Sequence, residues 1–140
     1  MDNVDAIISD LNNLINTKGK DFVLYNFEKT IIASKNPYLA YYFLKEAVPS
    51  LYHDYVRIII DSHDNNLIYK TILLENISNN LKKELIKAII DSKDAEMCYN
   101  IAYNYYNKNN KDDLCRVVVE SKNPEVCLKY AFNIKLCSTL

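Results

Sequence analysis

Apolar and polar residues follow a pattern that recurs four times along the chain. Each copy contains a serine, and the four serines are 28, 30 and 29 residues apart. An apolar residue precedes each serine by seven positions, and a pair of Ile or Val precedes it by three and two. Because this spacing places one apolar stripe along a helix, it predicts an amphipathic helix, which we call helix A. The serines with these three residues are Ser34 (Phe27, Ile31, Ile32), Ser62 (Tyr55, Ile59, Ile60), Ser92 (Leu85, Ile89, Ile90) and Ser121 (Leu114, Val118, Val119).

A second helix, which we call helix B, is predicted to begin two positions after each serine. Asn or Asp stands there in every copy, and Pro follows it in two copies. Asn and Asp side chains accept hydrogen bonds from the free N–H groups of a first helical turn, and Pro fits the first helical position. Apolar residues then recur five, six, nine and ten positions after the serine, and no alternating pattern indicates a strand. The residues at these four positions are Leu39, Ala40, Phe43, Leu44; Leu67, Ile68, Thr71, Ile72; Met97, Cys98, Ile101, Ala102; and Val126, Cys127, Tyr130, Ala131.

The short interval between helix A and helix B predicts that each pair folds back as an antiparallel hairpin. Turn-prone residues at Pro49–Ser50, Asn79–Asn80 and 107–110 are expected to link one hairpin to the next. Residues 3–17 place Ile and Leu on one helical face, which predicts a capping helix. Gly19 just beyond it can take the left-handed C-cap conformation.

We therefore predict an all-α fold, a right-handed α-solenoid of about four antiparallel helical hairpins with an N-terminal capping helix. The chain is expected to form a single domain, residues 1–140. Its predicted segments are the cap at 3–17 and the repeats at 20–49, 50–78, 79–108 and 109–140.

The repeated S-K-[DN]-P turn, followed by a short helix bearing Tyr and Ala, resembles α-solenoid repeats such as those of the HEAT and tetratricopeptide (TPR) classes. A unit of about 29 residues is shorter than either, and the tetratricopeptide pattern W-x-x-L-G-x-x-Y is absent. Residues 20–140 more closely resemble unclassified helical repeats in proteins of phages, giant viruses and low-GC bacteria. The resemblance implies a binding surface and no attached chemistry. Abundant Asn, Ile, Lys and Tyr are typical of an AT-rich genome.

Charge and hydropathy exclude several kinds of partner. The chain has 17 Lys and Arg against 18 Asp and Glu, so no net field attracts it to nucleic acid or anionic lipid. No apolar run approaches the ~20 residues of a membrane span, and the N-terminus lacks the basic start of a secretory signal. We therefore expect a soluble, cytoplasmic protein with no membrane partner.

The charged positions of helix A follow an acid, base, acid order in three copies. These residues lie three or four positions apart, so they are expected to pair along the solvent face rather than bind phosphate. They are Asp54, Arg57, Asp61; Glu84, Lys87, Asp91; and Asp113, Arg116, Glu120.

Candidate catalytic and metal-binding patterns are missing from the sequence. It contains no G-x-S-x-G, P-loop or H-E-x-x-H, and its single glycine leaves no loop that could cradle a phosphate. His53, His63 and the cysteines have no zinc-binding spacing, so the cysteines are expected to be reduced. The terminal CSTL matches a prenylation box only formally, because Ser138 and Thr139 are not aliphatic. We expect no enzyme activity, metal or cofactor. The cysteines are Cys98, Cys115, Cys127 and Cys137.

The outward positions of helix B vary between copies, and repeat proteins diversify the surface that meets a partner. Seven positions after the serine, three of the four copies carry Tyr, a residue that often supplies binding energy at interfaces. A half-buried boundary with hydroxyls turned to water explains the same tyrosines equally well. The predicted partner-binding residues are Tyr38, Tyr41, Tyr42, Tyr69, Lys70, Tyr99, Asn100, Tyr103 and Lys129.

These features predict a non-catalytic protein–protein interaction module, an adaptor, scaffold or inhibitor that binds another protein. One alternative is binding of single-stranded nucleic acid through tyrosines and lysines, as the stretch YNIAYNYYNKNN suggests. That alternative is less favoured because bases are few and Asp112 and Asp113 follow directly. A third hypothesis is structural self-association by end-to-end stacking of hairpins, so we expect a monomer or weak self-association.

Overall fold

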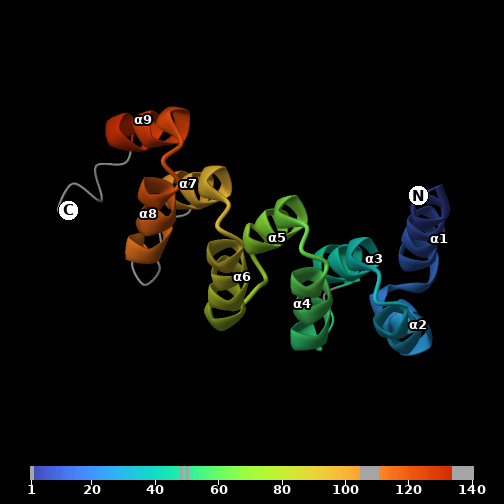
Figure 1. The fold of residues 1–140 in the computed structure, drawn as a ribbon. Coiled ribbons are helices and arrows are strands. Elements are labelled where there is room, and N and C mark those ends of the chain that lie inside the picture. Colours follow the sequence, from blue (N-terminus) through green and yellow to red (C-terminus); the bar gives the residue numbers. More distant parts are fainter. Residues whose placement is uncertain (1, 48, 50, 105–110, 134–140) are drawn as a thin grey trace. The chain divides into compact units, whose positions relative to one another are not determined.

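The computed structural model describes residues 2–47, 49, 51–104 and 111–133. These residues form helices joined by short links, with no strand among them, which confirms the all-α prediction (Figure 1). No helix within them is both long and apolar enough to cross a membrane. The elements are α1 Asp2–Lys18, α2 Lys20–Ser34, α3 Pro37–Tyr42, the π-helix η1 Phe43–Ala47, α4 Tyr52–Asp61, α5 Asn65–Ile72, α6 Asn79–Ser92, α7 Ala95–Asn104, α8 Lys111–Glu120 and α9 Pro124–Asn133.

The chain divides into two compact units, Met1–Ser78 and Asn79–Leu140. The first contains α1 to α5 and the second contains α6 to α9. Each unit holds two of the four sequence repeats, and we describe each by itself. The single domain and the right-handed solenoid stay predictions.

The serine that defines each repeat closes the end of helix A. In every copy its hydroxyl donates a hydrogen bond of 2.5–2.6 Å to the carbonyl oxygen three residues earlier. The oxygens of Ser34, Ser62 and Ser121 also accept a 3.2 Å bond from the N–H of the Asn or Asp two residues later. The serine therefore ends one helix and fixes the first residue of the next. These three serines and their later partners are Ser34 with Asn36, Ser62 with Asp64, and Ser121 with Asn123.

The predicted helix starts are confirmed in all four copies. Asn36 accepts hydrogen bonds from the N–H groups of Tyr38 and Leu39, at 2.9 and 3.2 Å. In each of the other copies the Asn or Asp accepts from the first turn of helix B at 3.0–3.3 Å. The donors there are Leu67 to Asp64, Met97 to Asp94, and Glu125 and Val126 to Asn123.

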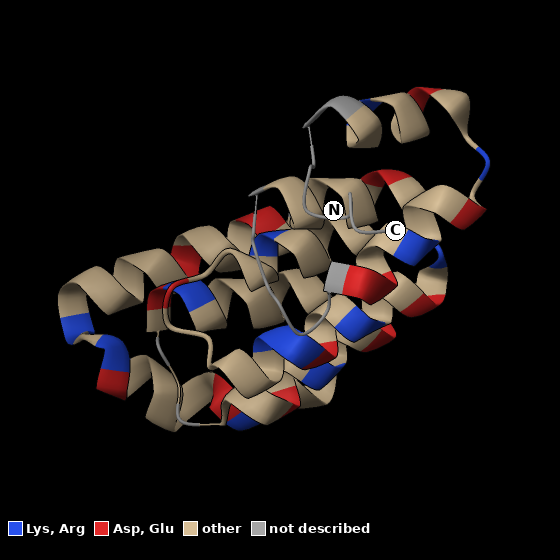
Figure 2. Ribbon diagram, turned by 90° about the vertical axis from the view of Figure 1, so that its left-hand side faces the viewer, with Lys and Arg blue, Asp and Glu red and all other residues tan. Residues whose placement is uncertain are grey.

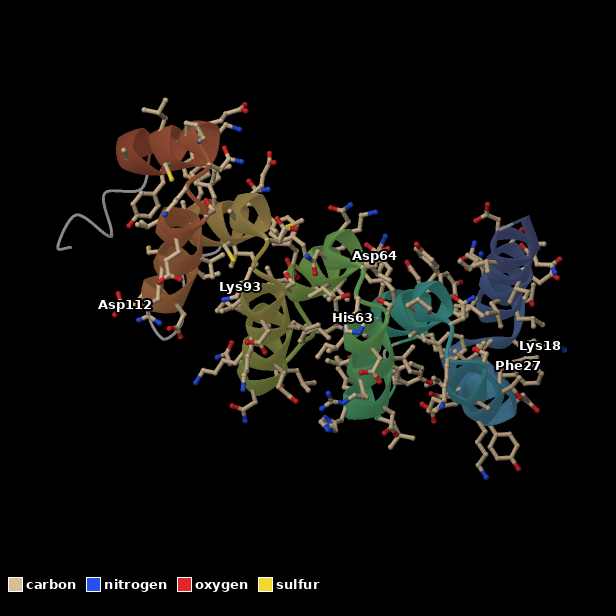
Figure 3. The ribbon with its side chains drawn as sticks, viewed as in Figure 1. Lys18, Phe27, His63, Asp64, Lys93 and Asp112 are labelled. Carbon is tan, nitrogen blue, oxygen red and sulfur yellow. The ribbon has the colours of Figure 1, made fainter. Side chains whose placement is uncertain are left out.

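The residue between the serine and the cap adopts a left-handed backbone conformation, which the sequence did not indicate. Within the described residues, φ is positive outside glycine only at these four positions, where it lies between 53° and 58°. Figure 3 labels two of them, His63 and Lys93, at the turns between their helices. This conformation costs an L-residue about 1–2 kcal/mol. The hydrogen bonds of the flanking serine and of the Asn or Asp cap must offset this cost. The four residues are Lys35, His63, Lys93 and Lys122.

Gly19 joins α1 to α2 and has a φ of 95° and a ψ of 163°. The prediction of a left-handed C-cap there is wrong, because this ψ belongs to an extended region that essentially only glycine adopts. The Gly19 N–H still donates to the Ile15 carbonyl at 3.0 Å and so closes α1.

The predicted link at Asn79–Asn80 is also wrong. The link occupies residues 73–78, and α6 already begins at Asn79. Pro49 lies outside the helices as expected. Ser50 and the link at 107–110 lie outside the described residues.

Most of the predicted apolar columns are buried, but the column two positions before the serine is not. Ile32, Ile60 and Ile90 are half-buried there, and Val119 is 49% exposed. Phe27 in the first copy and Cys127 and Tyr130 in the last are also half-buried, and Ala131 is exposed. One further buried column, six positions before the serine, was missed. It contains Val56, Ile86 and Cys115 in the last three copies, and the first copy has Glu28 there instead. The Tyr55 hydroxyl donates to the Glu28 carboxylate at 3.0 Å, so this polar exception ties α2 to α4.

Candidate functional site

Four of the nine predicted partner-binding residues line one groove in Met1–Ser78. Its volume is about 300 Å³, and its walls come from α1, from α3 with η1, and from α5. The predicted residues in it are Tyr38, Tyr41, Tyr42 and Lys70. The other lining residues are Ile8, Asn12, Lys45, Glu46 and Leu67. We call this surface the tyrosine groove.

Two of the tyrosine hydroxyls are held by neighbouring elements. Tyr38 donates to an Asp64 carboxylate oxygen at 3.0 Å, and this bond, with the charge of Asp64, raises the pKa of Tyr38. The Tyr42 hydroxyl lies 3.4 Å from the amide oxygen of Asn12, and burial together with Glu46 raises the pKa of Tyr42. Both phenols therefore stay protonated at neutral pH and act as hydrogen-bond donors with fixed directions.

The π-helix η1 forms the end of the groove wall that carries Lys45 and Glu46. Its Phe43, Leu44 and Ala47 side chains are buried in the core of the unit. π-helical turns often occur at functional sites, and they leave carbonyl groups without the usual helical donor. Asn76, in the link after α5, donates from Nδ2 to the Leu44 carbonyl at 2.8 Å and to the Tyr52 hydroxyl at 2.7 Å.

Charges around the groove are mixed. Lys45 and Lys70 are exposed, and neither forms a hydrogen bond or an ion pair in the described part of the chain. Glu46 lines the same groove, and Asp64 is bound to Tyr38 beside it. Figure 2 shows basic and acidic residues interspersed along the ribbon. The arrangement can offer hydrogen-bond donors to a ligand.

The remaining predicted residues do not line the tyrosine groove. Tyr69 is half-buried on α5. In Asn79–Leu140, Tyr99 is only 8% exposed and its ring stacks on that of the exposed Tyr103, with centroids 5.8 Å apart. Asn100 is half-buried on α7 and Lys129 is exposed on α9. A partner-binding role for the tyrosines seven positions after the serine stays a prediction, and the burial of Tyr99 fits the boundary interpretation better than a contact surface.

Sequence reasoning missed Ile8, Asn12 and Lys45 as members of the site. Ile8 and Asn12 belong to α1, which the pattern identified only as a cap. Its repeated Ile spacing does show an apolar face, but not which helix that face meets. Lys45 depends on the π-helix, for which the sequence contains no local signal.

A second groove, of about 480 Å³, lies between the α2–α3 turn and α4. A smaller hollow of about 80 Å³ in Asn79–Leu140 uses the same repeat positions. Both hollows are lined by the Lys that directly follows the serine of one repeat. The next repeat contributes its serine, the acidic residue one position before that serine, and the Ile or Val four positions before it. Consecutive repeats are therefore related similarly within each unit. The matching residues are Lys35, Ile58, Asp61 and Ser62, and Lys93, Val117, Glu120 and Ser121.

Charged residues of helix A pair on the surface in the described part of the chain. Arg116 pairs with Asp113 at 3.1 Å on the surface, a contact of the predicted kind that contributes little stability. No group of three or more potential metal ligands occurs within residues 2–47, 49, 51–104 and 111–133.

Three cysteines fall within the described residues. Cys98 and Cys127 are free, but Cys115 is disulfide-bonded, so the prediction that all cysteines are reduced is wrong for Cys115. Burial, with a contribution from Asp94, raises the pKa of Cys98 to about 12. Its thiol is therefore unreactive at neutral pH.

No protein-family model matches the chain, and neither a curated protein nor a solved structure matches it. The fold defines the class only broadly, as an all-α protein, and the groove adds a tyrosine-lined surface in Met1–Ser78.

Proposed function

We propose that this chain is a non-catalytic protein–protein interaction module whose partner binds in the tyrosine groove. The observation that carries the proposal is the convergence of Tyr38, Tyr41, Tyr42 and Lys70 on one groove. Tyr38, Tyr42 and Lys70 occupy outward positions of helix B that vary between copies, and Tyr41 belongs to the column in which three of the four copies carry Tyr. Tyrosine combines a large apolar ring with a hydroxyl donor, and it supplies much binding energy in known interfaces.

We also propose that the repeats stack as a right-handed α-solenoid in a single cytoplasmic domain of viral, phage or low-GC bacterial type. The recurring hollow between one turn and the next helix A supports this arrangement, because it appears once in each unit at equivalent positions. In a solenoid each repeat contacts its neighbours in the same way.

Single-stranded nucleic acid is a weaker candidate for the groove. Met1–Ser78 contains seven Lys and Arg but ten Asp and Glu, and Glu46 and Asp64 lie among the tyrosines. A strand with one negative charge per nucleotide would be repelled by these carboxylates. A protein partner presents fewer and more widely spaced charges.

Photo-crosslinking from two positions tests the proposal. Benzoylphenylalanine replaces Tyr41 in the groove, or Tyr25 on α2, which is 90% exposed and lies outside the groove. After irradiation in cells that express the protein naturally, we expect a discrete protein adduct from position 41 and not from position 25. The adduct should resist nuclease.

Three outcomes would overturn the proposal. Equal adducts from both positions would deny the groove any special role. A nuclease-sensitive adduct would favour nucleic acid, and an adduct joining two copies of this chain would favour self-association.

A further inference from the structure

We infer that the tyrosine groove receives a peptide segment in which one or two carboxylate side chains flank a large apolar side chain. This inference rests on the proposed function and specifies the chemistry of the partner at the same site. It depends on the groove's apolar floor, on its two unpaired lysines and on the way its walls are held.

The floor of the groove is apolar. Leu67 is 4% exposed and Ile8 is half-buried, and the rings of Tyr41 and Tyr42 are partly exposed beside them. A volume of about 300 Å³ corresponds to roughly ten water molecules at about 30 Å³ each. An apolar side chain that displaces this water gains from the hydrophobic effect.

The unsatisfied groups at the groove are mainly donors. Lys45 extends from η1 and Lys70 from α5, and neither ammonium group is paired. The Tyr41 hydroxyl likewise makes no hydrogen bond in the described part of the chain. Ionised carboxylates only accept hydrogen bonds and carry the opposite charge, so they complement two lysines and a phenol.

Acidic groups restrict where a negative ligand can lie. Glu46 lines the groove, and a smaller hollow that shares Ile8 and Tyr38 with it also contains Asp5. Asp64 is bound to Tyr38 in the same region. The Tyr38 side therefore disfavours further negative charge, while Lys45 and Lys70 favour it. Isolated carboxylates satisfy both conditions, whereas a polyanion does not.

The groove walls are held before any ligand arrives. Asn76 fixes the Leu44 carbonyl of η1, and Asp64 and Asn12 engage the hydroxyls of Tyr38 and Tyr42. A site whose side chains are already ordered loses less entropy on binding. Binding of a short segment is therefore feasible without rearrangement of the unit.

A selection experiment tests the inference with a phage library of random 12-residue peptides and the full immobilised chain. We expect enriched sequences to place Asp or Glu within about three residues of Leu, Ile or Phe. A synthetic peptide of this kind should bind about tenfold more tightly than its Asn/Gln counterpart in fluorescence anisotropy, equivalent to about 1.4 kcal/mol.

Lysine variants show whether the groove causes this preference. The double variant Lys45→Gln, Lys70→Gln should reduce the tenfold preference for the acidic over the neutral peptide to less than about threefold. The matched control is Lys20→Gln with Lys29→Gln, which changes two exposed lysines of α2 outside the groove. It should keep the full preference, and circular dichroism should show equal helix content in both.

The inference is overturned if no acidic enrichment appears, if both double variants behave alike, or if a twelve-nucleotide oligothymidine binds more tightly than the acidic peptide. Its failure differs from failure of the proposed function. A groove that crosslinks a protein partner at position 41 but prefers neutral or basic peptides retains the function and loses only the acidic chemistry.

Discussion

Helix B of the first repeat and helix B of the third have the same apolar columns but present different surfaces. The first runs through α3 into η1, Pro37–Ala47, and the third is α7, Ala95–Asn104. Seven positions after the serine, Tyr41 is half-buried and lines the groove, whereas Tyr99 is buried and stacks on Tyr103. Equivalent positions in a repeat therefore share a backbone role without sharing the same surroundings.

Two further differences between these copies involve residues that pack inside Met1–Ser78 and do not line the groove. At the ninth position after the serine, the first copy has Phe43, whose ring stacks on Tyr55 with centroids 5.9 Å apart, and the third has Ile101. Six positions before the serine, the first copy has Glu28 where the others have buried apolar residues. Departures from a repeated pattern are expected at functional sites, so the first copy is the stronger candidate for binding.

The largest expected effect comes from truncating the ninth position in both copies. Phe43 and Ile101 are fully buried, so Phe43→Ala should lower the free energy of unfolding by about 3–5 kcal/mol and Ile101→Ala by about 2–5 kcal/mol. Urea denaturation measures both losses. If the chain is one domain with a shared core, hydrogen exchange should accelerate in both units for each variant. Acceleration confined to the unit that carries the substitution would contradict the single-domain prediction.

The next effect concerns the hydrogen bond by which Asn76 supports helix B of the first copy. Asn76→Ala removes the donor to the buried Leu44 carbonyl and leaves it unsatisfied, so the free energy of unfolding should fall by about 1–3 kcal/mol. Asn66→Ala is the matched control, because Asn66 is exposed and forms no hydrogen bond in the described residues. It should change stability by less than about 0.5 kcal/mol. Equal urea midpoints for the two variants would mean that Asn76 does not hold η1.

Local patterns in the sequence identified the helices, their caps and most of the core. A helical period and an Asn or Asp at the first turn act over a few residues, so they can be read directly from positions such as Asn36 and Ile59. The buried column at Val56 was missed because the predicted apolar stripe included the neighbouring position, seven before the serine, but not position six. Position six joins the stripe only if the apolar face of helix A is assumed to be wider than those three positions.

Features that depend on tertiary contacts could not be predicted. In the π-helix at Phe43–Ala47, the Leu44 carbonyl accepts a hydrogen bond from Asn76, which lies 32 positions later in the sequence. The groove likewise requires α1 to lie beside α3, and the sequence around Ile8 does not indicate which helix α1 contacts. The tyrosines of the site could be predicted because the outward positions of a helix follow its period. The walls formed by α1 and η1 could not be predicted in this way.

The smallest expected effect tests whether the turn is strained equally in both copies. Lys35 and Lys93 have φ values of 53° and 58°, a conformation that costs an L-residue about 1–2 kcal/mol. Glycine adopts it freely but loses about 0.5–1 kcal/mol more entropy on folding. Lys35→Gly and Lys93→Gly should therefore each raise the free energy of unfolding by about 0.5–1 kcal/mol in urea denaturation. Lys29→Gly, an exposed substitution within α2, should instead lower it by about 1 kcal/mol. If either turn variant lowers stability as the control does, the left-handed turn is not a source of strain in that copy, and the four repeats do not share one turn design.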